Sequence, residues 1–155
     1  MLNICKRQWD KNKDKLEKAL RENQSLNRRD YLYLVKTVVD VILNDETAME
    51  EFKDYSTGRI VEIDDGEHQG TLLYVIPRNT YQPNDYDYLM TSVGYGSCGG
   101  CDTLQAIQDY GIFPTTEEQY TDYMNLCLHL IQNMIRPFGG DWDTSDDFKT
   151  CEVDE

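Results

Sequence analysis

Basic residues, histidine and long apolar runs are all scarce in this sequence. Of 155 residues, 15 are Lys or Arg against 29 Asp or Glu, and two are His. Because histidines are few and no nucleophile, base and orienting group occur together, we expect no enzymatic activity. No apolar run approaches the roughly 18 residues that span a bilayer, and the N-terminal stretch is polar from Lys6 onward, unlike a secretory signal. We therefore expect a soluble cytoplasmic protein with no membrane partner and no cofactor.

Cysteine is too sparse and too scattered for a disulfide framework. The chain has five cysteines, an odd number, at Cys5, Cys98, Cys101, Cys127 and Cys151. Without an export signal, this pattern predicts reduced thiols.

Charge divides the chain into unequal parts. Residues 1–29 hold nine Lys or Arg against four acids, whereas residues 30–155 hold six against 25. We predict a basic amphipathic helical arm at 1–29, a single α+β domain at 30–140 and an acidic tail at 141–155. The acidic body repels phosphates, so we expect no direct binding of nucleic acid.

Hydrophobic spacing predicts helices at both ends of the chain. Apolar residues at helical spacing indicate an amphipathic helix over 8–23, a buried helix over 30–43 and a short helix over 45–54. Capping patterns place two further helices at 103–110 and 116–135.

The middle of the chain changes to the period of a β-strand. The runs "RIVEIDD" (59–65) and "GTLLYVIP" (70–77) predict an antiparallel hairpin, and "YDYLMTSV" (86–93) predicts a third strand. The fold class expected is therefore α+β, with a small antiparallel sheet of three to four strands packed against the N- and C-terminal helices.

The third predicted strand has one aromatic face. Tyr86, Tyr88 and Met90 alternate with Asp87, Leu89 and Thr91. Because aromatic side chains supply much of most cores, we expect this face to be buried under a helix. The alternative is a binding surface, which would permit a homo-oligomeric structural role.

Residues 95–107, "YGSCGGCDTLQAI", invite four interpretations. Cys98 and Cys101 have the spacing of half a zinc site, for which Cys127, His129 and His68 could supply further ligands. Cys127 and His129 point to different helix faces, so one of them at most could join. The same pair could be a redox CxxC, although the adjacent Asp102 opposes thiolate formation. The match of "GYGSCG" to a phosphate loop is rejected, because it contains no Lys or Arg.

The fourth interpretation, a tight turn from strand to helix, is the one we favour, since glycine permits the backbone to reverse sharply. The string also resembles a "YGSC-x-GCDTL" turn of uncharacterised small bacteriophage and prophage proteins. This resemblance covers about a tenth of the chain. It implies a phage accessory role and brings no known activity or site residues.

The acidic tail contains a partial match to a calcium-binding loop. Asp141, Asp143, Ser145 and Glu152 fall at ligand positions of an EF-hand, but Asp146 replaces the glycine that this loop requires. We do not expect calcium binding.

The function that these observations favour is binding to a basic protein. We expect a non-enzymatic accessory protein that inhibits a host protein with a basic nucleic-acid-binding groove, as anti-CRISPR and other anti-defence proteins do, by presenting carboxylates in place of phosphates. The alternative is a small zinc- or thiol-dependent protein that uses Cys98 and Cys101. The candidate partner-binding residues are Asp64, Asp65, Glu67, Asp85, Asp87, Glu117, Glu118 and Asp122.

Overall fold

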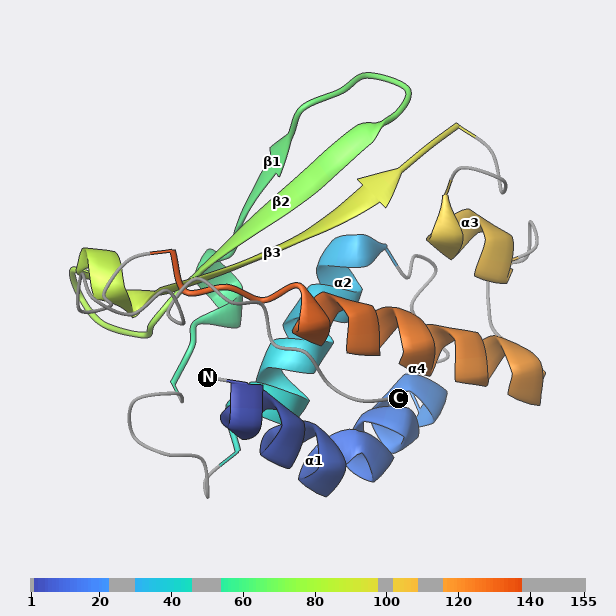
Figure 1. Ribbon diagram of the computed structural model, residues 1–155, viewed down its shortest axis with the longest axis horizontal. Coiled ribbons are helices and arrows are strands. Elements are labelled where there is room, and N and C mark those ends of the chain that lie inside the picture. Colours follow the sequence, from blue (N-terminus) through green and yellow to red (C-terminus); the bar gives the residue numbers. More distant parts are fainter. Residues whose placement is uncertain (1, 23–29, 46–53, 98–101, 109–115, 138–155) are drawn as a thin grey trace.

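The fold combines helices with one small antiparallel sheet, as the sequence predicts. The computed structural model describes residues 2–22, 30–45, 54–97, 102–108 and 116–137. Its main elements are α1 (Leu2–Glu22), α2 (Tyr31–Val38), β1 (Val61–Asp64), β2 (Gly70–Pro77), β3 (Tyr88–Tyr95), α3 (Thr103–Gln108) and α4 (Glu117–Gln132). The three strands are ordered β1-β2-β3, with both pairs antiparallel (Figure 1). The predicted α+β class is confirmed.

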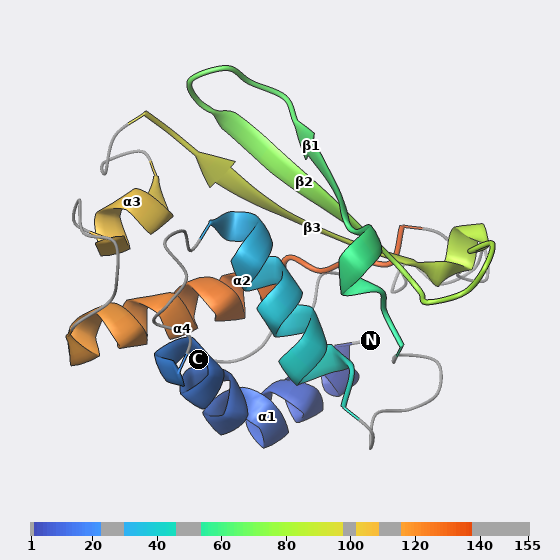
Figure 2. The same ribbon diagram turned by 180° about the vertical axis from the view of Figure 1, so that it is seen from behind.

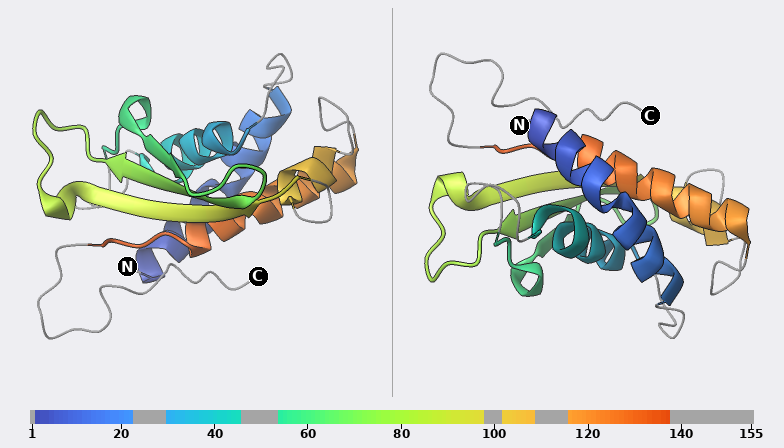
Figure 3. Two further views of the ribbon diagram at one scale, coloured as in Figure 1. Left: turned by 90° about the horizontal axis from the view of Figure 1, so that it is seen from above. Right: turned by 90° about the horizontal axis from the view of Figure 1, so that it is seen from below.

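The helices lie on one side of the sheet. Helix α4 packs against β3 and α2 packs beside it, while α1 crosses both on the side away from the sheet (Figures 1 and 2). Seen from below, α1 lies in front of the other helices with the sheet behind them (Figure 3). The core therefore forms between the sheet and α1, around α2 and α4.

The segment predicted as a basic arm belongs to this common core over residues 2–22. Leu16 and Leu20 of α1 are fully buried, and Trp9 is nearly so. Lysines occupy the solvent side of the same helix, as the amphipathic pattern predicts. Residues 23–29 lie outside the described part of the chain.

The predicted buried helix over 30–43 is confirmed, with a change of geometry at its end. Asp30 caps α2 by accepting a hydrogen bond of 2.8 Å from the Tyr33 N–H. The helix then widens into a π-helical turn, Val39–Leu43, which ends at Asn44. The Asn44 side chain both donates to and accepts from the backbone of Tyr55, at 2.8 Å each. The predicted helix at 45–54 falls almost entirely outside the described residues.

The remaining predicted helices are also present where the structure describes them. Thr116 and Gln119 form the reciprocal capping box that begins α4. Asp102 accepts a bond of 3.1 Å from the Gln105 N–H at the start of α3.

The predicted burial of Tyr86, Tyr88 and Met90 is wrong. Leu89 and Thr91 face the helices instead, while Tyr86 is 57% exposed in a short 3-10 turn before β3. A polar residue can face the core here because the Thr91 hydroxyl donates to the Leu130 carbonyl of α4 at 2.7 Å. Alternation alone could not show which of the two faces would find such a partner.

The two outer strands differ in what lies beside them. After α4 the chain returns to β3, where Met90 and Ile135 exchange backbone hydrogen bonds of 2.9 and 2.8 Å. Within the described residues, β1 has β2 as its one pairing strand. All four residues of β1 are exposed, and β1 is the open edge of the described sheet.

Candidate functional site

The acidic residues selected from the sequence lie in three separate places. Asp64, Asp65 and Glu67 belong to the β1–β2 hairpin. Asp85 and Asp87 lie in the turn before β3, at the opposite end of the sheet (Figure 1). Glu117, Glu118 and Asp122 lie in the first turns of α4. The fold therefore does not bring the eight residues together into one surface.

Two of these acids are paired with arginines. Glu117 accepts a hydrogen bond of 2.9 Å from Arg21 of α1, which lowers the pKa of that carboxyl group. Asp87 lies 3.6 Å from the Arg78 guanidinium. These pairs join elements of the fold, and their charge is partly compensated.

A pocket between the sheet and the start of α2 gathers a different set of acids. Its volume is about 340 Å³. The residues that line it are Asp30, Tyr31, Leu32, Glu62, Asp64, Leu72, Tyr74, Tyr95 and Asp102. The lining residues include four carboxylates and three tyrosines, and no lining residue is basic. We call this cavity the acidic tyrosine pocket.

Strand register places two of the carboxylates in this pocket. Glu62 lies opposite Tyr74, and Asp64 lies opposite Leu72. Cross-strand partners share a face of the sheet, so both acids are on the same face as the core residue Tyr74. The acids of β1 thus lie on the helix side of the sheet. The β1–β2 hairpin extends beyond the helices (Figure 1), and Glu62 and Asp64 are exposed.

Asp64 is held in position by the sheet and the hairpin. It accepts hydrogen bonds of 2.6 Å from the Tyr95 hydroxyl and 3.0 Å from the Gly66 N–H. These bonds lower the pKa of Asp64, and the same carboxylate raises the pKa of Tyr95 to about 12. At neutral pH the pair is therefore an ionised carboxylate and a neutral phenol.

Asp102 is buried and joins three parts of the chain. It accepts bonds of 2.7 Å from the Tyr31 hydroxyl and 3.2 Å from the Gly96 N–H, besides the bond from Gln105. Burial is the main cause that raises the pKa of Tyr31. Asp102 thus links Gly96, just after β3, to α2 and α3, whereas residues 98–101 of the predicted strand-to-helix turn lie outside the described residues.

Tyr74 carries an unpaired polar group in this pocket. Its side chain is fully buried, and its hydroxyl has no hydrogen-bond partner within the described residues. Burial, followed by the nearby Glu62 carboxylate, raises the pKa of Tyr74. The hydroxyl is therefore neutral at physiological pH, and as a buried polar group without a partner it would gain a hydrogen bond from a ligand that reaches it.

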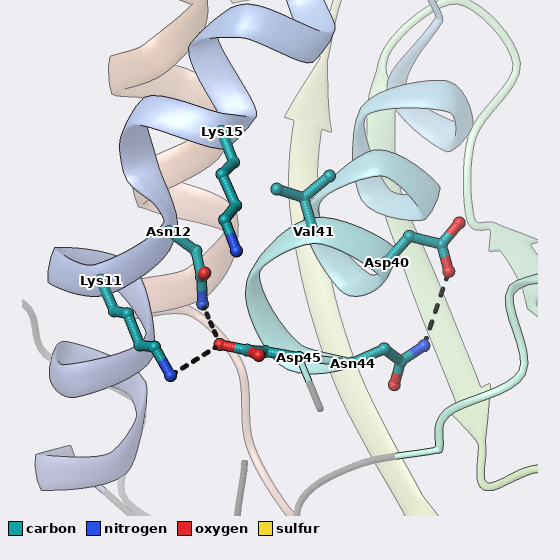
Figure 4. A pocket seen from close by; sticks show the side chains of 7 residues that line it. All are labelled: Lys11, Asn12, Lys15, Asp40, Val41, Asn44 and Asp45. Atoms are coloured by element: carbon teal, nitrogen blue, oxygen red, sulfur yellow. Dashed lines mark hydrogen bonds and ion pairs between the residues drawn. The ribbon is translucent and has the colours of Figure 1, made fainter. Parts of the chain in front are cut away.

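A second pocket differs in its charge balance. It lies between α1 and the π-helical turn, has a volume of about 520 Å³, and is lined by Lys11, Asn12, Lys15, Asp40, Val41, Asn44 and Asp45 (Figure 4). Asp45 binds Lys11 at 3.1 Å and the Asn12 amide at 3.0 Å. Acids and bases are thus both present, and their contacts join α1 to the turn.

The cysteine motif cannot be placed in the fold. Cys98 and Cys101 lie outside the described residues, as do Asp141, Asp143, Ser145 and Glu152 of the calcium-like match. Within the described residues, no group of three or more His, Cys, Asp or Glu side chains could hold a metal ion. The zinc interpretation remains a prediction.

The remaining cysteine and histidine predictions can be compared with the structure. Cys127 is fully buried, and burial raises the pKa of its thiol to about 12. His129, two residues later, is exposed and bonds to Gln132 at 2.9 Å, so Cys127 and His129 do point to different faces of α4.

Cys5 is disulfide-bonded, which corrects the prediction that all thiols are reduced. His68 is exposed in the β1–β2 hairpin.

Sequence reasoning found one pocket acid as a binding residue and missed the others. The sequence predicts a binding role for Asp64 and none for Asp30, Glu62 or Asp102. The alternation of Glu62 and Asp64 on one strand face could have indicated the pair. The approach of Asp30 and Asp102 depends on tertiary packing, for which the sequence carries no local signal.

Comparisons with protein-family models, with curated proteins and with solved structures find no match to this chain. In the part of the chain that the structure describes, no helix has the length and apolar character needed to cross a bilayer.

Proposed function

We propose that this protein is a non-enzymatic, phage-type accessory protein that binds a host protein and blocks its basic nucleic-acid-binding groove. The observation that carries the proposal is the acidic tyrosine pocket, where four carboxylates line one cavity and none of the lining residues is basic. Such a cavity favours a cationic group over a phosphate. The net charge of -14 would attract a basic partner from a distance.

Carboxylates can replace phosphates in this role because both offer negatively charged oxygens to Lys and Arg. Glu62 and Asp64 are exposed at the open edge of the described sheet, so a partner can reach them. Asp65 and Glu67 extend the negative surface along the hairpin. The protein would act in the host cytoplasm, as an anti-CRISPR or another anti-defence inhibitor.

The test is capture of partners from a host lysate at low salt, followed by elution at high salt and mass spectrometry. We expect a basic, nucleic-acid-binding protein in the high-salt eluate, because screening weakens contacts between exposed charges. The captured protein, once purified, should lose bound labelled DNA or RNA when this protein is added. Retention of no basic protein, or an unchanged nucleic-acid complex, would contradict the proposal.

A second candidate function is self-association through the opposite face of the sheet. Val61 and Ile63 are 55% and 49% exposed there. The strand residues of this face, which include Leu73, Val75 and Met90, carry no charge. Two acidic copies could therefore meet on it without bringing carboxylates together.

A further inference from the structure

We propose that the acidic tyrosine pocket accepts the guanidinium group of a single arginine side chain of the partner. This inference rests on the proposed function and names the group that the partner inserts. The observations behind it are the four pocket acids, which are Glu62 and Asp64 of β1, the α2 cap Asp30 and Asp102 just before α3, and the unpaired Tyr74 hydroxyl.

The arrangement of the acids favours an organic cation over a metal ion. Although four carboxylates line the pocket, no three such groups in the described residues converge closely enough to hold a metal. A metal ion needs its oxygen ligands within about 2.0 to 2.6 Å, whereas a guanidinium spreads its charge and its donors over a plane. The volume of about 340 Å³ is at the lower end for small-ligand pockets.

The remaining groups suit arginine better than lysine. Arginine offers five N–H donors in a fixed plane, which can bond a carboxylate such as Glu62 and also donate to the Tyr74 hydroxyl. Tyrosine rings provide faces on which the guanidinium can stack. Leu32 and Leu72, which also line the pocket, provide an apolar contact for the methylene stem.

Tyr74 gives the proposal a discriminating variant. By distance and angle its hydroxyl makes no hydrogen bond in the described structure, and the nearest acid that acts on it is Glu62, so Tyr74→Phe removes no well-formed bond of the folded protein. A purely structural role predicts that this change leaves binding unaltered. A role in holding arginine predicts weaker binding without loss of folding.

The experiment measures the fluorescence anisotropy of labelled peptides, Gly-Ser-Arg-Ser-Gly and its lysine and citrulline versions, with the full-length protein. Citrulline keeps the shape of arginine but has no charge. We expect the arginine peptide to bind about tenfold more tightly than the citrulline peptide, and several-fold more tightly than the lysine peptide. Equal binding of arginine and citrulline would overturn the proposal.

Two variants locate the binding site. Glu62→Gln should weaken binding of the arginine peptide about tenfold, and Tyr74→Phe should weaken it several-fold. Glu22→Gln is the matched control, because it makes the same change of charge at an exposed position at the end of α1, outside the pocket. An equal loss in the control would show general attraction to an acidic protein and would overturn the pocket assignment.

The two proposals can fail separately. If a basic partner is captured and released by salt but the peptide does not distinguish arginine from citrulline, the pocket assignment is wrong and the proposed function stands. If the arginine peptide binds in the pocket but no nucleic-acid-binding partner is captured, the proposed function is wrong and the pocket assignment stands.

Discussion

The two faces of the sheet are built from the same strands and differ in almost every property. On the helix side, Tyr74, Ile76 and Leu89 are buried, and Glu62 and Asp64 are exposed at the edge strand. On the opposite side, Val61 and Ile63 are exposed, and the strand positions carry no charge. In β1, therefore, the acids lie on the side of the core and the apolar residues on the side of the solvent.

This inversion indicates that β1 is not placed by burial alone. An edge strand that only completed the core would turn its valine and isoleucine toward the helices. The observed register instead puts two carboxylates beside three tyrosines and leaves apolar side chains open. Both features are compatible with the binding proposed for the two faces, and substitutions on each face test whether the faces differ in this way.

The largest expected loss of stability comes from a substitution on the buried face of the sheet. Ile76→Ala should lower the free energy of unfolding by about 2 to 5 kcal/mol, because Ile76 is fully buried and the change leaves a cavity. Val61→Ala on the open face is the control and should change it by about 0.5 kcal/mol or less. Urea unfolding of both variants measures the difference, and equal effects would contradict the assignment of the faces.

Removal of the buried Asp102 carboxylate, at the end of the pocket, should cause the second-largest loss of stability. Asp102→Ala leaves the Tyr31 hydroxyl and the Gly96 N–H without their acceptor. The expected loss is about 3 kcal/mol, since each buried donor without a partner costs about 1 to 3 kcal/mol. Glu118→Ala, at an exposed position, should cost little. A fully stable Asp102→Ala variant would disprove the network.

Tyr74→Phe should increase the stability of the protein. The change removes a buried hydroxyl that has no partner in the described residues, so the free energy of unfolding should rise by about 1 kcal/mol. Thermal or urea unfolding measures it. A loss of stability would mean that the hydroxyl has a partner that supports the fold, and would remove its proposed role in binding.

Changes on the open face should affect association more than folding. Val61→Thr combined with Ile63→Thr should alter the free energy of unfolding by about 0.5 kcal/mol or less, because both side chains are half exposed or close to it. If copies associate through this face, the double variant should sediment as a smaller species than the original protein at equal concentration. A strict monomer in both cases would count against self-association.

The smallest effect expected is the pH dependence of the Asp64 and Tyr95 pair. Because the pKa of Asp64 is lowered, its contribution to stability is present above the ordinary value of 3.8 and is lost as the pH falls through the folded value. Because the pKa of Tyr95 is raised, its contribution is present below 10 and is lost as the pH rises toward about 12.

Tyr95→Phe removes this pair and gives the comparison. The difference in urea midpoint between this variant and the original protein should be constant between about pH 5 and pH 9 and should shrink at both extremes. A constant difference through pH 3 or through pH 11 would contradict the hydrogen bond between Asp64 and Tyr95.

The sequence predicts the elements well because their signals are local. The capping box of Thr116 and Gln119, the hairpin of β1 and β2, and the buried helix after Asp30 all depend on residues close together in the chain. The choice of the buried face of β3 depends instead on the Leu130 carbonyl, which lies 39 residues after Thr91. The acidic tyrosine pocket is similar, since Tyr31 and Asp102 meet across 71 residues.

The most direct test is methyl NMR of the protein during titration with the arginine peptide. Leu32 and Leu72 line the acidic tyrosine pocket, whereas Ile63 and Val75 lie on the opposite face of the sheet. If arginine binds in this pocket, the methyl signals of Leu32 and Leu72 move and saturate while those of Ile63 and Val75 stay in place. Shifts confined to Ile63 and Val75, or to neither pair, would contradict binding in this pocket.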